Sequence, residues 1–211
     1  MQITSAMKMV SAARLKKSQD RIEKMRPYAE KMNQLISDLS AGSENKGGLT
    51  EKREDNKVLF VLLSSNRGLC GSFNSSLVKY LEELRKKNFL KTKNQVFCLG
   101  KKASPILKRK GFGVTEINTE ILDEPHFEKT SKIAENIMLD FLNQKWDKVI
   151  VIYNKFKNAA VQIPFHEQLL PIKKLDNERK NNNTYSFEPS SEEILEELLP
   201  DSIKIKIFNI F

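Results

Sequence analysis

The residues best placed to do chemistry form one short stretch, residues 64–74, which reads SSNRGLCGSFN. It follows an apolar run and combines Gly68 and Gly71 with the basic Arg67 and with hydroxyl and amide side chains. A glycine turn between a strand and a helix can hold a phosphate group. However, a Walker A loop needs G-x-x-x-x-G-K-[ST], and no lysine follows Gly71, while a dinucleotide fingerprint needs a third glycine. We therefore interpret Gly68 and Gly71 as structural residues that allow positive φ in a tight corner.

Other catalytic or metal chemistry has little support in the sequence. Cys70 and Cys98 are the only cysteines and form no C-x-x-C pair, which favours two reduced thiols over a metal site or a redox pair. His126 and His166 stand alone, and no Ser-His-Asp set stands out. The sequence thus predicts no catalytic residue, no metal site and no cofactor site.

The charge of the chain is basic and uneven. Its formal net charge is +9, with eight basic against four acidic residues in 1–41 and eleven against two in 79–110. Such patches attract an acidic partner, which can be nucleic acid, anionic lipid or an acidic protein loop. No apolar run approaches the roughly 20 residues of a membrane-spanning helix.

The middle of the chain alternates between apolar runs and helical patterns. This order predicts an α/β domain over residues 57–187, with a mainly parallel, five-stranded, Rossmann-like sheet and flanking helices. Pro164 has no amide hydrogen to donate, so the fifth strand is expected at an edge. The expected strands are 57–65, 94–100, 112–117, 147–156 and 160–165, and the helices lie near 77–84, 103–111 and 127–144.

A long helix is predicted for residues 3–39, within an N-terminal segment 1–41 that the polar linker 42–56 joins to the α/β domain. Pro27 removes one backbone donor and should bend this helix. At 1.5 Å per residue the helix extends about 57 Å, so it must project beyond the domain. Apolar residues spaced three and four apart predict a coiled-coil seam formed by Ile22, Met25, Ala29, Met32, Ile36 and Leu39.

A second helix should begin near Ser190, which with Glu193 has the spacing of a capping box. Residues 190–211 are expected to form a C-terminal helix, of which residues 194–211 reach only about 27 Å. We expect this to be too short to cover the seam. In the isolated chain, residues 1–40 should then fray or pair with a second copy, while the α/β domain stays folded.

Three stretches resemble the γ subunit family of F-type ATP synthase. They are QITSAMKMVSAARLKKSQDRIEKMRPYAEKM, SSNRGLCGSFN and VIYNKFKNAAVQIPFHEQLLPI, in the family's order and spacing over nearly the whole chain. Asn66 departs from the Asp that is common in the turn. The family's residues before QIT and its long C-terminal helix after Phe211 have no counterpart in the 211 residues.

The resemblance implies a non-catalytic rotor shaft of the F1 sector, which couples proton translocation to ATP synthesis on the β subunits. In that interpretation, residues 1–41 are the N-terminal shaft helix and residues 190–211 are the start of a truncated C-terminal shaft helix. It implies α, β and ε subunits and the c-ring of Fo as partners, and no nucleic acid. It places Met7 and Lys8 where the shaft passes acidic β loops, and Arg67 and Lys79 against a β-subunit loop. The location it implies is peripheral, on the cytoplasmic side of the bacterial inner membrane, with the matrix side of the mitochondrial inner membrane as the alternative.

Two other functions stay open at this point. A basic, helix-bearing α/β protein can bind nucleic acid, although no known nucleic-acid-binding signature is present. An α/β enzyme that binds a nucleotide is the other alternative.

Overall fold

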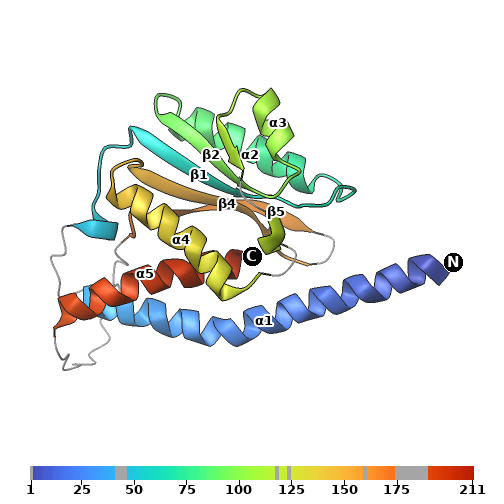
Figure 1. Ribbon diagram of the computed structural model, residues 1–211, viewed down its shortest axis with the longest axis horizontal. Helices are drawn as coiled ribbons and strands as arrows, with labels where there is room; N and C mark the ends of the chain where they lie inside the picture. The colour runs from blue at the N-terminus through green and yellow to red at the C-terminus, as the bar shows by residue number, and fades with distance from the viewer. Residues whose placement is uncertain (1, 41–46, 117–118, 123–124, 159–160, 174–189) are drawn as a thin grey trace.

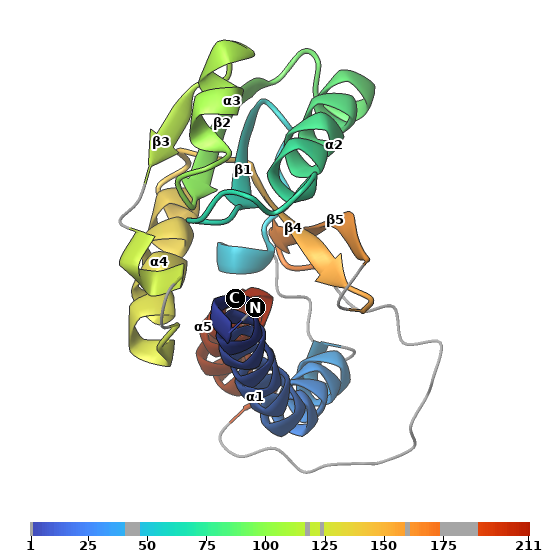
Figure 2. The ribbon, with the colours of Figure 1, turned by 90° about the vertical axis from the view of Figure 1, so that its right-hand side faces the viewer.

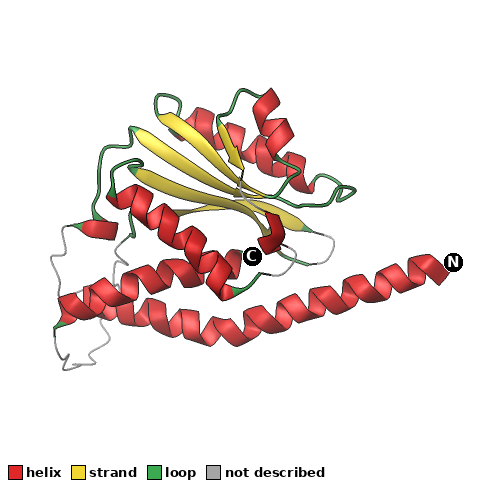
Figure 3. Ribbon diagram, in the orientation of Figure 1, coloured by secondary structure: helices red, strands yellow, loops and turns green. Residues whose placement is uncertain are grey.

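The computed structural model describes residues 2–40, 47–116, 119–122, 125–158, 161–173 and 190–211. An α/β domain lies on one side of the molecule, and a single long helix runs beneath it and projects beyond it (Figure 1). Helices cover both faces of a central sheet (Figure 3). The expected α/β class and projecting N-terminal helix are confirmed.

The sheet has five strands in the order β3-β2-β1-β4-β5. The first four are parallel, and β5 pairs antiparallel with β4 at one edge. In this order β2 and then β3 lie on one side of β1, and β4 lies on the other side, as in Rossmann-like sheets. The strands are β1 (Lys57–Leu63), β2 (Lys93–Leu99), β3 (Val114–Glu116), β4 (Lys148–Phe156) and β5 (Gln162–Leu170).

The central strand β1 is buried on both faces, because side chains alternate across a strand. Phe60 and Leu62 belong to one hydrophobic cluster, and Leu59 and Val61 belong to the other. A strand buried on both faces must be apolar throughout, which is why β1 reads as a continuous run.

The helices divide between the two faces. On one face, α2 (Phe73–Asn88) and α3 (Ser104–Arg109) cover the cluster that contains Phe60. On the other, α4 (Phe127–Leu142) packs with α5 (Ser191–Ile210), and α5 in turn packs against α1 (Gln2–Ser40). Figure 2 shows α5 and α1 side by side below the sheet. Two short 3-10 helices, η1 (Gly48–Thr50) and η2 (Thr119–Leu122), complete the described elements.

The edge position expected from Pro164 is confirmed, but β5 extends to Leu170, beyond the predicted range. The segment predicted as a linker is also more ordered than expected in its described part. Leu49 is buried, its carbonyl accepts the Ile172 amide at 2.9 Å, and Arg53 donates to the Phe141 carbonyl at 2.8 Å. Residues 41–46 lie outside the described residues. Among the helices that the structure describes, none is both long and apolar enough to cross a membrane.

Candidate functional site

Helix α1 has two halves with different surroundings. We call residues 21–40 the proximal half and residues 4–20 the projecting half. Every residue of the projecting half is exposed, and it carries the predicted contact residues Met7 and Lys8. Met7 and Met9 are each 65% exposed, although methionine side chains are apolar. The projecting half therefore presents a mixed apolar and basic surface.

The proximal half contains the predicted seam, and much of it is covered. Met32, Ile36 and Leu39 are 6%, 7% and 2% exposed. They belong to the same hydrophobic cluster as Leu195, Leu199 and Ile203 of α5, and Met25 and Ala29 pack against that cluster while partly exposed. Ile22 lies in α1, but its side chain is outside the described residues.

This arrangement corrects the expectation that the seam has no partner within the chain. Helix α5 has 20 residues and spans about 30 Å, whereas the stretch from Met25 to Leu39 spans only about 21 Å. The C-terminal helix is thus long enough for this part of the seam, and the helix continues through Pro200. What it leaves uncovered is the projecting half.

Ion pairs and hydrogen bonds fasten α5 and the proximal half to the α/β domain. Lys204 of α5 pairs with Glu135 of α4 at 3.2 Å, and Lys206 pairs with Glu167 of β5 at 2.9 Å. The Arg21 guanidinium donates to the Pro125 carbonyl at 3.0 Å. Because α5 packs against both α4 and α1, it joins α1 to the α/β domain.

The glycine turn between β1 and α2 is a compact, hydrogen-bonded corner. Asn74, which is buried, accepts the Ser65 amide at 3.0 Å and donates to the Ser65 hydroxyl at 2.8 Å. That hydroxyl donates in turn to the Arg67 carbonyl at 2.6 Å. Gly71 has φ +59°, as the structural interpretation of this glycine requires, whereas Gly68 has no such φ. The other positive φ in the turn belongs to Leu69, at 60°.

The two predicted basic contact residues near this turn are both exposed. Arg67 lies in the turn itself, and Lys79 lies on α2 with its side chain 78% exposed. Lys79 is 4.0 Å from Glu83, one helical turn along. Exposed pairs of this kind are worth only about 0–1 kcal/mol, so Lys79 stays available to a partner.

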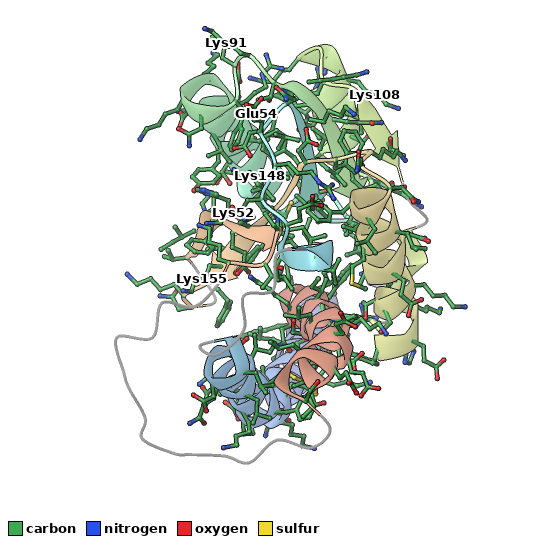
Figure 4. All side chains as sticks on the ribbon, turned by 90° about the vertical axis from the view of Figure 1, so that its left-hand side faces the viewer. Lys52, Glu54, Lys91, Lys108, Lys148 and Lys155 are labelled. Atoms are coloured by element: carbon green, nitrogen blue, oxygen red, sulfur yellow. The ribbon has the colours of Figure 1, made fainter. Side chains whose placement is uncertain are left out.

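The basic segment 79–110 is partly neutralised within the domain. Glu82 pairs with both Lys86 and Lys110, and hydrogen bonds from these two lysines hold the pKa of Glu82 below its usual value. The Arg85 guanidinium lies over the Phe112 ring, with 4.5 Å from its central carbon to the ring centroid. Other cations extend into solvent, as Figure 4 shows for Lys91. Nothing among these contacts favours nucleic-acid binding.

A cavity of about 480 Å³ lies between the antiparallel edge of the sheet and the α1–α5 pair, and His166 is one of its lining residues. His166 Nδ1 is 2.6 Å from the Tyr80 hydroxyl. Burial, with a smaller contribution from the positive charge of Lys173, lowers the pKa of His166. Within the described ranges, no group of three or more His, Cys, Asp or Glu side chains is arranged to hold a metal ion.

Comparison with known proteins finds similarity over the whole chain. A family model described as ATP synthase matches residues 1–211. The ATP synthase gamma chain of Christiangramia forsetii is 48% identical in an alignment that covers 99% of this chain and 73% of that protein. The ATP synthase gamma chain of Flavobacterium johnsoniae is 46% identical with the same coverage.

A solved structure shares the fold. A chain in the central stalk and c-ring structure of the Tetrahymena thermophila mitochondrial ATP synthase matches with a TM-score of 0.66 and 24% identity, over 99% of this chain and 90% of that one. At that identity the likeness concerns the fold alone. The family match and the gamma chains that are almost half identical establish that the chain belongs to the ATP synthase gamma-chain family.

Proposed function

We propose that the projecting half of α1 turns inside a ring of α and β subunits, while the α/β domain lies beside the ε subunit and the c-ring of Fo. As a gamma-chain family member, the chain is a non-catalytic rotor subunit of the ATP synthase, which couples proton translocation to ATP synthesis. The assignment of each contact to a named subunit is the proposal.

The observation that carries this proposal is the contrast within α1. The proximal half is fastened to the domain through α5, whereas the projecting half exposes Met7, Met9 and Val10 without burying them against the described part of the chain. A protein rarely leaves a long helix with apolar residues in solvent unless a partner surrounds it. A shaft needs these two properties, because it must be held firmly at one end and must contact its surroundings at the other.

The basic residues fit the same arrangement. Lys8 lies on the projecting half, Arg67 lies in the turn that precedes α2, and Lys79 lies within α2. Acidic loops of the β subunits are the complementary partners, because exposed cations guide association with acidic surfaces. We place the complex on the cytoplasmic side of a bacterial plasma membrane, with the matrix side of the mitochondrial inner membrane as the alternative.

Copurification tests the proposal. The tagged chain, expressed with the α, β and ε subunits of the same organism, should bring down all three. The double reversal of Arg67 and Lys79 to Glu should reduce the recovered α and β subunits, and ε should stay bound. A matched control reverses Lys87, in the last turn of α2, and Lys91, just beyond the end of that helix. Equal recovery of α and β with the two double variants would contradict the assignment of Arg67 and Lys79.

A further inference from the structure

Leu69 combines two features that an ordinary turn residue lacks. Its side chain is fully exposed, with a relative accessibility of 110%, and its backbone has φ 60°. A leucine in the left-handed region is strained, because its Cβ crowds the backbone, and such strain gathers at functional sites. Glycine or asparagine would fill this position at lower cost to the fold. The fold alone therefore gives no reason for leucine here.

Hydrogen bonds fix the turn that presents Leu69 to the first residues of α2. Asn74 accepts the Ser65 amide at 3.0 Å, and its side-chain nitrogen lies 3.2 Å from Cys70 Sγ. The Phe73 amide donates to the Cys70 carbonyl at 3.2 Å, which closes the turn onto α2. Leu69 thus stands at the tip of a fixed corner and loses little freedom when it is buried against a partner.

A second turn places another cation beside this tip. The turn after β2 packs directly on the end of β1, where a Cβ at Gly100 would collide with the Ser64 carbonyl. The Lys102 amide donates to the Ser65 carbonyl at 3.1 Å. The Lys102 side chain then lies along Gly68, with its Cε 3.7 Å from the position that a Cβ there would take. Lys102 and Arg67 are both exposed. The leucine tip is therefore bordered by two cations from different elements.

We propose that Leu69 is an apolar anchor that inserts into an apolar depression on an acidic loop of the β subunit, with Arg67 and Lys102 against the acidic rim. An exposed leucine fits an apolar depression, and two flanking cations fit carboxylates around it. The choice of the β subunit rests on the proposed function. The anchor itself concerns Leu69 and Lys102, which the sequence did not single out.

Competition for limiting subunits tests the anchor. Equal amounts of wild-type chain and of a variant with a distinct mass are assembled with limiting α and β subunits, and the incorporated ratio is read by mass spectrometry. Leu69→Gly removes the side chain and suits the same φ, so the free chain should melt at the wild-type temperature or above. In the assembly, wild type should exceed Leu69→Gly by about 10- to 100-fold, the range expected for one buried leucine.

Two controls separate the anchor from general effects. Gln144→Gly relieves the other non-glycine residue that has a positive φ, 59°, among the residues that the structure describes. Leu90→Ala removes another exposed leucine, 69% accessible, beyond the far end of α2. Both should be incorporated about equally with wild type. Wild type should also outcompete the double variant Arg67→Gln/Lys102→Gln, and this advantage should shrink as salt rises. Salt screens the attraction between the two wild-type cations and the acidic partner. The ratio for Leu69→Gly should hardly change with salt.

The outcomes distinguish this inference from the function on which it rests. If wild type assembles with α and β subunits and Leu69→Gly competes equally, the anchor is wrong and the rotor function stands. If Leu90→Ala is excluded as strongly as Leu69→Gly, the effect is general hydrophobicity and the anchor is also wrong. If wild type itself does not assemble with α and β subunits, the proposed function fails and the anchor fails with it.

Discussion

The two halves of α1 show how one continuous helix can be stabilised in different ways. In the proximal half, Met32, Ile36 and Leu39 are buried, and α5 lies between this half and the domain. In the projecting half, every described residue is exposed. Isolated helices are marginal in water, so the projecting half depends on its own backbone hydrogen bonds and on continuity with the proximal half. The comparison indicates that tertiary packing, not helix propensity, sets local stability along α1.

Hydrogen exchange should give the largest contrast between the two halves. In the isolated chain as a monomer, amides of residues 32–39 should exchange at least about 100-fold more slowly, relative to intrinsic rates, than those of residues 7–17. Opening of a frayed end costs almost nothing, whereas the packed region opens with the core. The measurement is amide exchange by mass spectrometry at high dilution. Equal protection in both halves would mean that the projecting half is covered in a way that the contacts of the chain do not explain.

Truncating a buried residue of the proximal half should be the next largest effect. Leu39→Ala should lower the free energy of unfolding by about 2–5 kcal/mol, because Leu39 is 2% exposed and its loss leaves a cavity. The matched change Met9→Ala in the projecting half should shift it by about 0.5 kcal/mol at most. Urea denaturation followed by circular dichroism measures both. Similar losses for the two variants would remove the distinction between the halves.

Pro27 lies within α1 and is expected to weaken the helix that leads to the projecting half. Pro27→Ala restores an amide donor and should raise the local opening free energy of residues 7–26 by about 1–3 kcal/mol. Ser11→Ala is the control, since it improves propensity only slightly and adds no backbone hydrogen bond. Exchange rates in residues 7–26 measure the gain. If Ser11→Ala slowed exchange and Pro27→Ala did not, Pro27 would not be the residue that limits the stability of the projecting half.

The cap of α5 offers a smaller change that should affect only the proximal half. The Ser190 hydroxyl accepts the Glu193 amide at 3.2 Å. Ser190→Ala should cost about 0.5–2 kcal/mol in urea denaturation, because it leaves a helix amide without this partner. Ser75→Ala, at an exposed site on α2, is the control. Exchange should accelerate in residues 32–39 and stay unchanged in residues 7–17, and the opposite pattern would contradict the coupling of α5 to the proximal half.

Acidification should have the smallest effect on the stability of the chain. Burial lowers the pKa of His166 in the folded protein, so the unfolded chain binds its proton at higher pH. Its contribution to stability is present above the unfolded pKa of about 6.5 and is lost as pH falls toward the lower folded pKa. Protonation also prevents Nδ1 from accepting the Tyr80 hydroxyl.

Urea midpoints for wild type and His166→Gln at pH 7.5 and pH 5.5 measure this effect. His166→Gln should show a smaller loss between the two values than wild type. An identical loss in both would assign the pH dependence to other groups.

The elements of the fold that depend on local sequence pattern could be predicted from the sequence. The apolar run of β1, the spacing along α4 and the start of α5 at Ser190 each depend on neighbouring residues, and each prediction is confirmed. Of the capping box, the structure shows the bond from the Glu193 amide to the Ser190 hydroxyl. The antiparallel extension of β5 to Leu170 was not predicted, because strand pairing depends on a partner far away in the chain. The order at Leu49 was missed for the same reason, since η1 packs against α4 and the chain near Ile172.

Only some residues of the candidate site could be identified from the sequence. Arg67, Gly68 and Gly71 could be picked out because glycines and cations in a short turn are recognisable by type. Leu69 could not, since a leucine gives no sign in sequence that it will adopt φ 60° at full exposure. Lys102 lies more than thirty positions further along, and only the packing of Gly100 against Ser64 brings it to Gly68.

The sequence by itself determined that α1 is helical over almost its whole length and that apolar residues follow a seam, because both depend on spacing within a few turns. Only the tertiary structure decided which part of the seam is covered. Helix α5 is long enough to cover the stretch from Met25 to Leu39, and its ion pairs to α4 and β5 fix it there. Burial depends on the distance between elements that the chain brings together from opposite ends, and periodicity contains no information about that distance.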